Sequence, residues 1–282
     1  MLIALPAVPV LELRGVDAPA FAQAQFASDV SALASGHWHW STWLTAQGRV
    51  RAAFALLRPA HDQFLLLLRG GDGARLREDL KRFVLRARVA IDLRTDLAAF
   101  GSSDAGDLDT LGAPAGDALA QHGARLALAL PGARWQLLAP GTDLAATDPA
   151  FLAAWQLADI RAGLANLPAA LEGTQLPQWL GLERLGAVSV RKGCYPGQEV
   201  MARLHFKGGN KRGLARIAFQ AAALPAAGTA LAGEDEAGVL LDSAFSAPGQ
   251  AEGLAVLSLA GGASLRLADA TGTPIQVVSR FT

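Results

Sequence analysis

The C-terminal part of the chain carries short apolar runs separated by turn residues, and no segment there has a helical period. These runs occupy residues 214–220, 236–245, 252–260, 263–269 and 274–280. Runs of this length between turns are typical of β-strands. Several strands in succession without a helix favour a small closed β-domain. We therefore predict a C-terminal β-barrel domain over residues 211–282, preceded by a separate region over residues 1–210.

The preceding region mixes segments of strand period with segments of helical period. Apolar runs on either side of "QG" at residues 47–48 predict a β-hairpin. Strands are expected over residues 37–46, 49–58, 61–69, 87–94, 124–130 and 134–139, and helices over residues 17–33, 74–85 and 148–162. Residues 101–117 are rich in Gly, Ala and Asp and are expected to form a connection. Hairpins combined with helices favour an α+β fold over a purely parallel, doubly wound sheet.

The overall composition restricts the classes of partner and the compartment. The 282-residue chain carries 25 basic and 25 acidic side chains, so no net charge attracts nucleic acid or a membrane surface. Its one cysteine excludes an intramolecular disulfide and a thiolate cluster, which favours the reducing cytoplasm. The N-terminus has no basic leader, and no run approaches the roughly 20 apolar residues of a membrane span. We expect a mature cytoplasmic protein without a membrane segment.

Residues 191–213, "RKGCYPGQEVMARLHFKGGNKRG", concentrate residue types that are rare elsewhere in the chain. They contain the only cysteine, Cys194, the only tyrosine, Tyr195, and three of the four lysines. Six of their side chains are basic and one, Glu199, is acidic. This local charge fits an anion site, to which glycine-rich backbone adds N–H donors, and it equally fits a solvated hinge between domains.

Cys194 lies between a glycine and a Tyr-Pro-Gly turn, outside the interior of a helix or strand. The nearby ammonium of Lys192 would favour the reactive thiolate, whereas a lone cysteine is more often a small buried apolar residue. Gln198 and Glu199 begin a short helix or strand. Glu199 could pair with an arginine or hold the amino group of a ring-type ligand. Tyr195 could pack against a ligand or close the turn.

Two further candidates are weaker. His37 and His39 alternate with tryptophans on a predicted strand, so they share a face as a metal pair would, but no carboxylate or cysteine nearby in the sequence completes such a site. The tryptophans fit a core or a ligand-stacking face. "GGDGARL" at residues 70–76 lacks the Lys-Ser/Thr of a nucleotide-binding loop. We therefore expect no metal site.

The octapeptide "KGCYPGQE" resembles the signature of the YgfZ family, folate-binding proteins of the glycine-cleavage T-protein superfamily that are linked to the maintenance of iron-sulfur enzymes. The surrounding run "LPQWLGLERLGAVSVRKGCYPGQEVMARLHFKGGNKR" follows the same family pattern. Upstream, "QAQFASDV", "LTAQGRV" and "WQLADIRAG" resemble a helix, a hairpin turn and a Trp-bearing helix of that family. The strand-rich tail suits its C-terminal barrel.

This resemblance implies a T-protein-like α+β fold of three lobes with a central tetrahydrofolate pocket and a Cys-bearing loop at the edge of that pocket. It implies that Cys194 is the functional thiol. The folate-binding residues that it implies are Trp155, Lys192, Tyr195, Gln198, Glu199 and Arg203. It also implies iron-sulfur client enzymes as partners, a connection to tRNA modification, no direct contact with nucleic acid, and a monomer.

One departure from the superfamily bears on catalysis. The related aminomethyltransferases carry an aspartate just after the hairpin turn, where this sequence has Ala52 and Ala53. Without that carboxylate, aminomethyl transfer loses the group that orients the amine. We therefore expect a tetrahydrofolate-binding factor for iron-sulfur assembly or repair and no conventional enzyme. The alternatives are a folate-dependent aminomethyl or C1 transferase and an RNA-binding module, the latter with Tyr195 and Phe206 as its only aromatic residues in the basic segment.

Overall fold

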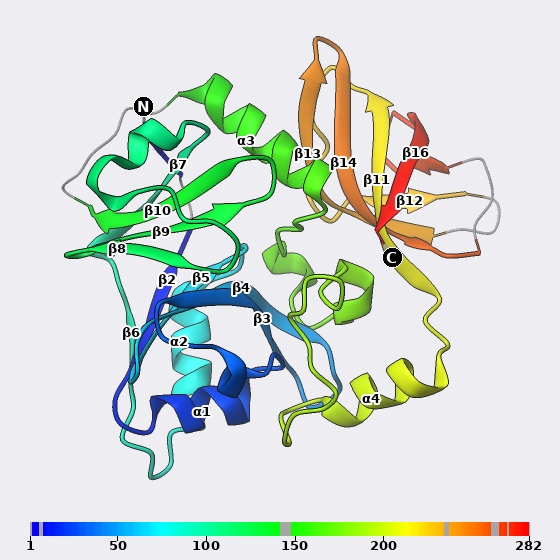
Figure 1. Ribbon diagram of the computed structural model, residues 1–282. Coiled ribbons are helices and arrows are strands. Elements are labelled where there is room, and N and C mark those ends of the chain that lie inside the picture. Colours follow the sequence, from blue (N-terminus) through cyan, green and yellow to red (C-terminus); the bar gives the residue numbers. More distant parts are fainter. Residues whose placement is uncertain are drawn as a thin grey trace.

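A computed structural model describes residues 2–5, 8–141, 148–233, 237–260, 265–269 and 271–281 of the chain. Two five-stranded sheets and one closed barrel form three lobes around a central region (Figure 1). This arrangement confirms the predicted α+β class and the three lobes. Within the described residues, no helix is long and apolar enough to cross a membrane.

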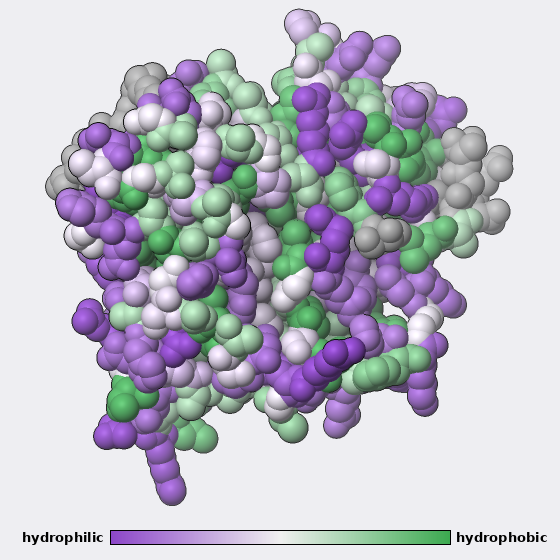
Figure 2. Space-filling view, viewed as in Figure 1, coloured by the Kyte–Doolittle hydropathy of each residue, from purple (hydrophilic) through white to green (hydrophobic). Residues whose placement is uncertain are grey.

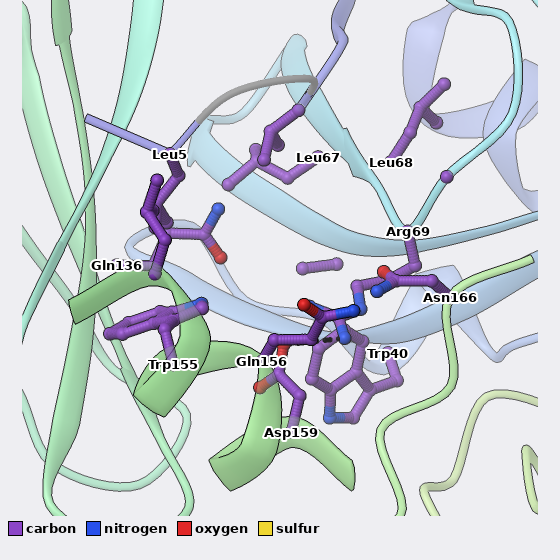
Figure 3. A pocket seen from close by; sticks show the side chains of 14 residues that line it. Leu5, Trp40, Leu67, Leu68, Arg69, Gln136, Trp155, Gln156, Asp159 and Asn166 are labelled. Atoms are coloured by element: carbon purple, nitrogen blue, oxygen red, sulfur yellow. Dashed lines mark hydrogen bonds and ion pairs between the residues drawn. The ribbon is translucent and has the colours of Figure 1, made fainter. Parts of the chain in front are cut away.

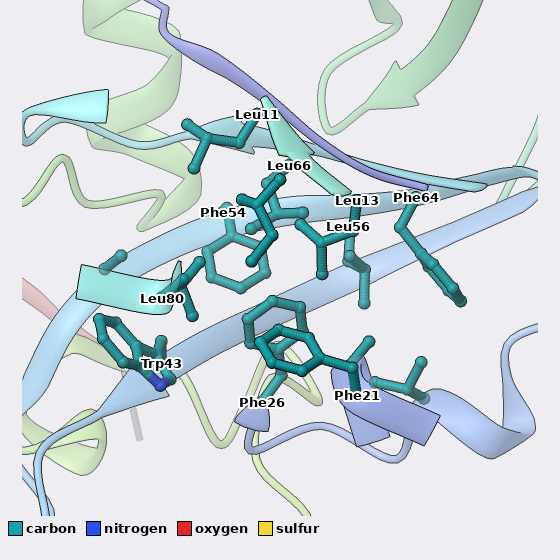
Figure 4. Close-up of a cluster of buried hydrophobic side chains, with 14 of the residues drawn as sticks. Leu11, Leu13, Phe21, Phe26, Trp43, Phe54, Leu56, Phe64, Leu66 and Leu80 are labelled. Atoms are coloured by element: carbon teal, nitrogen blue, oxygen red, sulfur yellow. The ribbon is translucent and has the colours of Figure 1, made fainter. Parts of the chain in front are cut away.

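The first lobe is an antiparallel sheet with the strand order β3-β4-β5-β2-β6. Its elements are β2 (Val10–Arg14), α1 (Ala18–Gln25), β3 (His37–Leu44), β4 (Val50–Ala60), β5 (Gln63–Leu68), α2 (Gly73–Lys81) and β6 (Ala90–Leu93). Large side chains such as Phe26, Phe54 and Trp43 fill the core between the sheet and the two helices (Figure 4). The predicted hairpin and the strand that follows it are confirmed. The helix predicted over residues 74–85 is present as α2 but ends earlier, at Lys81, and leaves Phe83 exposed.

The helix predicted over residues 17–33 is wrong in its length. α1 ends at Gln25, because Phe26 adopts an extended backbone and pairs with Trp43 of β3. The Phe26 side chain is fully buried and packs edge-on against Phe54, with ring centroids 4.9 Å apart. A short 3₁₀ turn, η1 (Val30–Ala32), follows and is capped by Asp29. Burial of one large side chain therefore overrides helical continuity here.

The second lobe is an antiparallel sheet with the order β1-β7-β10-β9-β8. Its elements are β1 (Ile3–Ala4), β7 (Leu97–Ser102), η2 (Ala105–Leu111), β8 (Leu119–His122), β9 (Arg125–Leu130) and β10 (Arg134–Pro140). Strands β9 and β10 confirm the predictions, whereas β1, β7 and β8 were not expected. These three strands are short or rich in Ala and Gly, so their period was too weak to indicate a strand.

Helix α3 (Pro149–Ala162) runs between the second sheet and the barrel and confirms the helix predicted there (Figure 1). The Asp148 carboxylate starts it by accepting hydrogen bonds from the backbone N–H groups of Ala150 and Phe151. Gly163 ends it in the left-handed conformation, with φ at 68°. The helix thereby places Trp155 and Asp159 toward the centre of the molecule.

The third lobe is a closed barrel with the order β11-β14-β13-β12-β15-β16. Its strands are β11 (Arg212–Gln220), β12 (Ala230–Ala232), β13 (Ala237–Ala247), β14 (Gln250–Ser258), β15 (Leu265–Leu267) and β16 (Pro274–Phe281). The predicted barrel is thus confirmed. The first residues of the strands expected over 236–245 and 263–269 lie outside the described residues, and β12 was not expected.

The segment between α3 and the barrel has little regular structure. It contains η3 (Ala169–Leu171), η4 (Pro177–Leu180) and the helix α4 (Gln198–Lys207). Buried side chains of this segment, including Leu180, Tyr195 and Met201, join one cluster with residues of β3, β4 and the barrel. The cluster fixes the irregular segment against two lobes at once.

Candidate functional site

A cavity of about 320 Å³ lies where the first sheet, the second sheet and α3 meet (Figure 3). Its wall is partly apolar, with Leu5, Leu67 and Leu152 on it, and partly aromatic, with Trp40 and Trp155. A volume of this size falls in the range of roughly 300–1,000 Å³ that is typical of small-molecule sites.

Trp155 is held rigidly in the cavity wall. Its ring stacks on Phe151 with centroids 5.7 Å apart, and the Arg134 guanidinium lies 4.6 Å from its centroid. Gly101 of β7 sits directly against the ring, since a Cβ atom there would come within 2.8 Å of it. Trp40 packs edge-on against Trp38, at 5.2 Å. The two tryptophans on the wall offer aromatic surface to a planar ligand.

Asp159 is the centre of a buried charge network beside this cavity. Its carboxylate accepts a hydrogen bond from Arg69 and another from Arg134, each at 2.9 Å. The three side chains expose only 4 to 14% of their surface. Arg69 also donates to the Leu164 carbonyl, and Arg134 to those of Pro131 and Trp155. The network keeps one net positive charge near the cavity.

One polar group on the wall, the Gln136 amide, is free to bind a ligand, and a second, the Nε atom of Arg69, is buried without a partner among the described residues. Within the described residues the Gln136 side-chain amide forms no hydrogen bond, and it points into the space between Trp155 and Arg69 (Figure 3). Gln136 and Arg69 were not predicted as site residues, because the sequence shows only isolated polar residues among strand residues.

The barrel reaches the cavity wall through Asp242 of β13. Its carboxylate accepts hydrogen bonds from Gln156 of α3, at 2.5 Å, and from Asn166, at 2.8 Å. Both amides line the cavity. The third lobe therefore helps to position one side of the cavity.

The motif loop, residues 191–197, is anchored by a buried lysine. The Lys192 ammonium donates to the backbone carbonyls of Gln23, Phe26 and Ser28 at 2.5, 2.6 and 2.9 Å. Burial lowers the pKa of Lys192 to about 8, while the charge of Asp29 acts in the opposite direction. All three N–H groups of the charged form have an acceptor. Lys192 therefore fastens the loop to the end of α1, and its ammonium is directed away from solvent.

Two neighbouring side chains complete the anchoring. Tyr195 is buried, with the Lys192 ammonium 5.2 Å from its ring centroid. Burial, and to a lesser extent the charge of Glu183, raises the pKa of Tyr195 to about 12. The Gln198 amide donates to the Lys192 carbonyl at 3.2 Å. Gly197 has a positive φ of 81° and lies so close to the hairpin turn that a Cβ atom would come within 2.6 Å of the Thr45 carbonyl.

The chain is similar in sequence to curated bacterial proteins. No family model matches the chain. The tRNA-modifying protein YgfZ of Edwardsiella ictaluri is 31% identical over 232 residues, which covers 76% of this chain and 70% of that protein. The chain belongs to the YgfZ family. An uncharacterized protein of Haemophilus influenzae is also 31% identical, over 75% of this chain and 71% of that protein.

The fold of this YgfZ family member is also that of a solved T-protein. The glycine cleavage system aminomethyltransferase T from Bartonella henselae matches with a TM-score of 0.74 over 99% of this chain and 84% of that chain. The two sequences are 15% identical, so the likeness concerns the fold. It confirms the T-protein-like architecture that the signature implied.

The residues predicted for the YgfZ-type site fall into three groups. Trp155 lies on the cavity wall, and none of the other six predicted residues does. Lys192, Tyr195 and Gln198 hold the motif loop. The third group is exposed to solvent and consists of Cys194, Glu199 and Arg203. The alternative that Cys194 is a buried apolar residue is therefore wrong.

The surroundings of Glu199 decide whether it pairs with an arginine. Glu199 forms no ion pair with any described residue, so the proposed pairing with an arginine is wrong.

His39 is bonded to the Ser28 hydroxyl at 3.0 Å, and burial lowers its pKa to about 4. Among the described residues, no group of three His, Cys, Asp or Glu side chains could hold a metal ion. Ala52 and Ala53 are buried in apolar packing of β4.

Proposed function

We propose that this YgfZ family member binds tetrahydrofolate in the central cavity and supports the assembly or repair of iron-sulfur clusters in client enzymes, including enzymes that modify tRNA. The observation that carries the folate half is the cavity itself, with aromatic walls, a free amide and a buried net positive charge. The name of the Edwardsiella relative and the aminomethyltransferase fold support the same reading.

The residues of the cavity suit the parts of a folate. Trp40 and Trp155 would contact a flat pterin ring by stacking. The Gln136 amide can both donate to and accept from the polar edge of such a ring. The positive charge of the Arg69 and Arg134 pair, only partly neutralised by Asp159, suits the carboxylates of a glutamate tail.

The exposed thiol of Cys194 carries the other half of the proposal. Its loop is fixed from behind by Lys192, so the thiol is presented to solvent from a rigid support. Because the described residues offer no other ligands around it, contact with a cluster requires ligands from a client protein. Cys194 would then act at a protein–protein contact.

The folate half is tested by titrating the purified protein with tetrahydrofolate in a calorimeter. Replacement of Gln136 by Ala is expected to weaken binding about fivefold to tenfold, the value of one net hydrogen bond. Trp155→Phe should weaken it by a similar factor, whereas Gln121→Ala, an exposed glutamine of β8, should leave affinity unchanged. Absence of binding by the wild type would remove folate from the proposal.

The cysteine half is tested in cells that depend on this protein. Cys194→Ala should abolish support of a cluster-dependent tRNA-modifying enzyme, measured as the level of the modified nucleoside, while folate affinity and thermal unfolding stay unchanged. Full modification in the mutant strain would contradict the role of the thiol and leave the folate half standing.

The fold favours one second candidate, a folate-dependent aminomethyl or C1 transferase. The buried Ala52 and Ala53 argue against it, because they replace the carboxylate that would orient the amine. Formation of methylenetetrahydrofolate from an amine donor by the purified protein would establish this candidate.

A further inference from the structure

The surface around α4 is rich in cations that have no acidic partner. Six side chains contribute to it, and among the described residues none of them forms an ion pair. They are Arg49, Arg191, Arg203, Lys207, Lys211 and Arg212. Figure 2 shows hydrophilic side chains beside a pale-green, mildly hydrophobic stretch over α4, and hydrophilic side chains along the linker that leads from it to β11. Since the chain as a whole is neutral, this local excess of positive charge is not a consequence of overall composition.

Tertiary contacts bring these cations together from three segments. The hairpin turn that precedes Arg49 packs on α4, because a Cβ atom at Gly48 would lie 3.0 Å from Val200. Two guanidinium groups lie over the ring of Trp179 in η4, that of Arg49 at 5.0 Å and that of Arg212 at 5.4 Å from a ring centroid. The Trp179 indole N–H donates to Asn210 at 2.9 Å, which ties the linker after α4 to the same point.

The patch also carries an exposed aromatic side chain, whose ring meets that of His205 edge-on with centroids 5.0 Å apart. Phe206 on α4 is 72% exposed and lies next to Lys207 in sequence. Cations suit phosphate groups, guanidinium planes supported by an indole suit phosphates or unstacked bases, and an exposed ring suits base stacking. An acidic peptide would use the cations alone. The combination therefore favours RNA with unpaired nucleotides.

We propose that the α4 surface binds the backbone and the unpaired bases of a structured RNA. In the sequence, Tyr195 and Phe206 are the only aromatics in the basic segment, which argues against an RNA-binding module. Tyr195 is buried, but the fold brings Trp179 and Arg49 to the segment from elsewhere in the chain. This surface is separate from the cavity wall, so the inference does not depend on folate binding.

The experiment measures fluorescence anisotropy of a labelled RNA hairpin with an unpaired loop, titrated with the full-length protein at several salt concentrations. Wild type should bind with a logarithmic affinity that falls linearly with the logarithm of salt concentration. The double charge reversal Arg203→Glu with Lys207→Glu should weaken binding at least tenfold at low salt and reduce the slope by about 1.4, or roughly 0.7 for each lost phosphate contact. Phe206→Ala should weaken binding of the loop and not of a blunt duplex.

A matched control places the same charge change elsewhere. Arg14→Glu with Arg86→Glu alters two exposed arginines of the first lobe that form no ion pair with a described residue, and should leave RNA affinity within about twofold of wild type. Equal losses in both double variants would overturn the proposal, as would no binding by wild type at low salt. Equally tight binding of a poly-glutamate peptide would overturn it in favour of an acidic protein partner.

Discussion

The cavity wall and the motif loop use buried charge in opposite ways. In the cavity, Asp159 neutralises one of two arginines, and the remaining positive charge faces the space that a ligand would fill. In the loop, the charge of Lys192 is turned inward onto backbone carbonyls, and the thiol of Cys194 stays at the surface. The first arrangement suits enclosure of a small molecule, and the second suits presentation of a thiol to another macromolecule.

The largest expected effect on the free energy of unfolding comes from a substitution in the charge network beside the cavity. Asp159→Ala leaves Arg69 and Arg134 buried without their acid, which should lower the free energy of unfolding by about 3–5 kcal/mol. Urea unfolding measures this loss in the free energy of unfolding. The matched control is Asp96→Ala, which removes a largely exposed partner of Arg94 and should cost about 1 kcal/mol or less. Equal costs would mean that the buried network contributes no more than a surface pair.

The next largest effect comes from a substitution of Lys192, which anchors the motif loop. Lys192→Met keeps the apolar stem but leaves two buried carbonyls and one partly buried carbonyl without a donor, so unfolding should become easier by about 2–3 kcal/mol. Cys194 is the only thiol, so its rate of reaction with a maleimide reports on the loop and should change in this variant. Lys207→Met, on the exposed side of α4, serves as the control. Unchanged stability and thiol reactivity would show that the loop is held by packing alone.

A smaller, pH-dependent effect on stability is expected from His39, which lies beside the carbonyls that Lys192 binds. His39 is bonded to Ser28, whose carbonyl accepts from Lys192, and its folded pKa of about 4 lies below the ordinary value of 6.5. The unfolded chain therefore binds the proton first as pH falls below 6.5, and stability is lost toward pH 4. Between pH 7 and pH 5 the loss attributable to His39 should be about 2 kcal/mol. In His39→Gln this part of the pH dependence should disappear, and its persistence would assign it to other groups.

The smallest expected effect concerns the Tyr195 hydroxyl, which is buried without a partner among the described residues. Removing an unsatisfied buried polar group costs little, so Tyr195→Phe should change the free energy of unfolding by about 1 kcal/mol or less and can increase it. Thermal unfolding is sufficient to test this. A clearly larger loss would show that the hydroxyl is bonded in solution.

Much of the architecture could be predicted from local pattern. The hairpin around Gly48, the helix over α3 and the strands of the barrel follow from hydrophobic period and turn residues, which act between near neighbours. The end of α1 could not, because Phe26 leaves the helix only when Trp43 and Phe54 are there to receive it. The division of the chain between residues 210 and 211 stays a prediction, although the barrel begins at Arg212.

The candidate site was less predictable than the fold. The sequence alone marked residues 191–213 as unusual in cysteine, tyrosine and charge, and its motif identified the family. Only the tertiary structure decided that Lys192 points inward, that Asp159 joins two arginines, and that Trp179 lies among the cations near α4. The physical reason is the distance along the chain over which each kind of interaction acts. Composition and period act along the chain, whereas the Lys192 and Asp159 contacts join residues from 25 to 169 positions apart, which meet only after the lobes have packed.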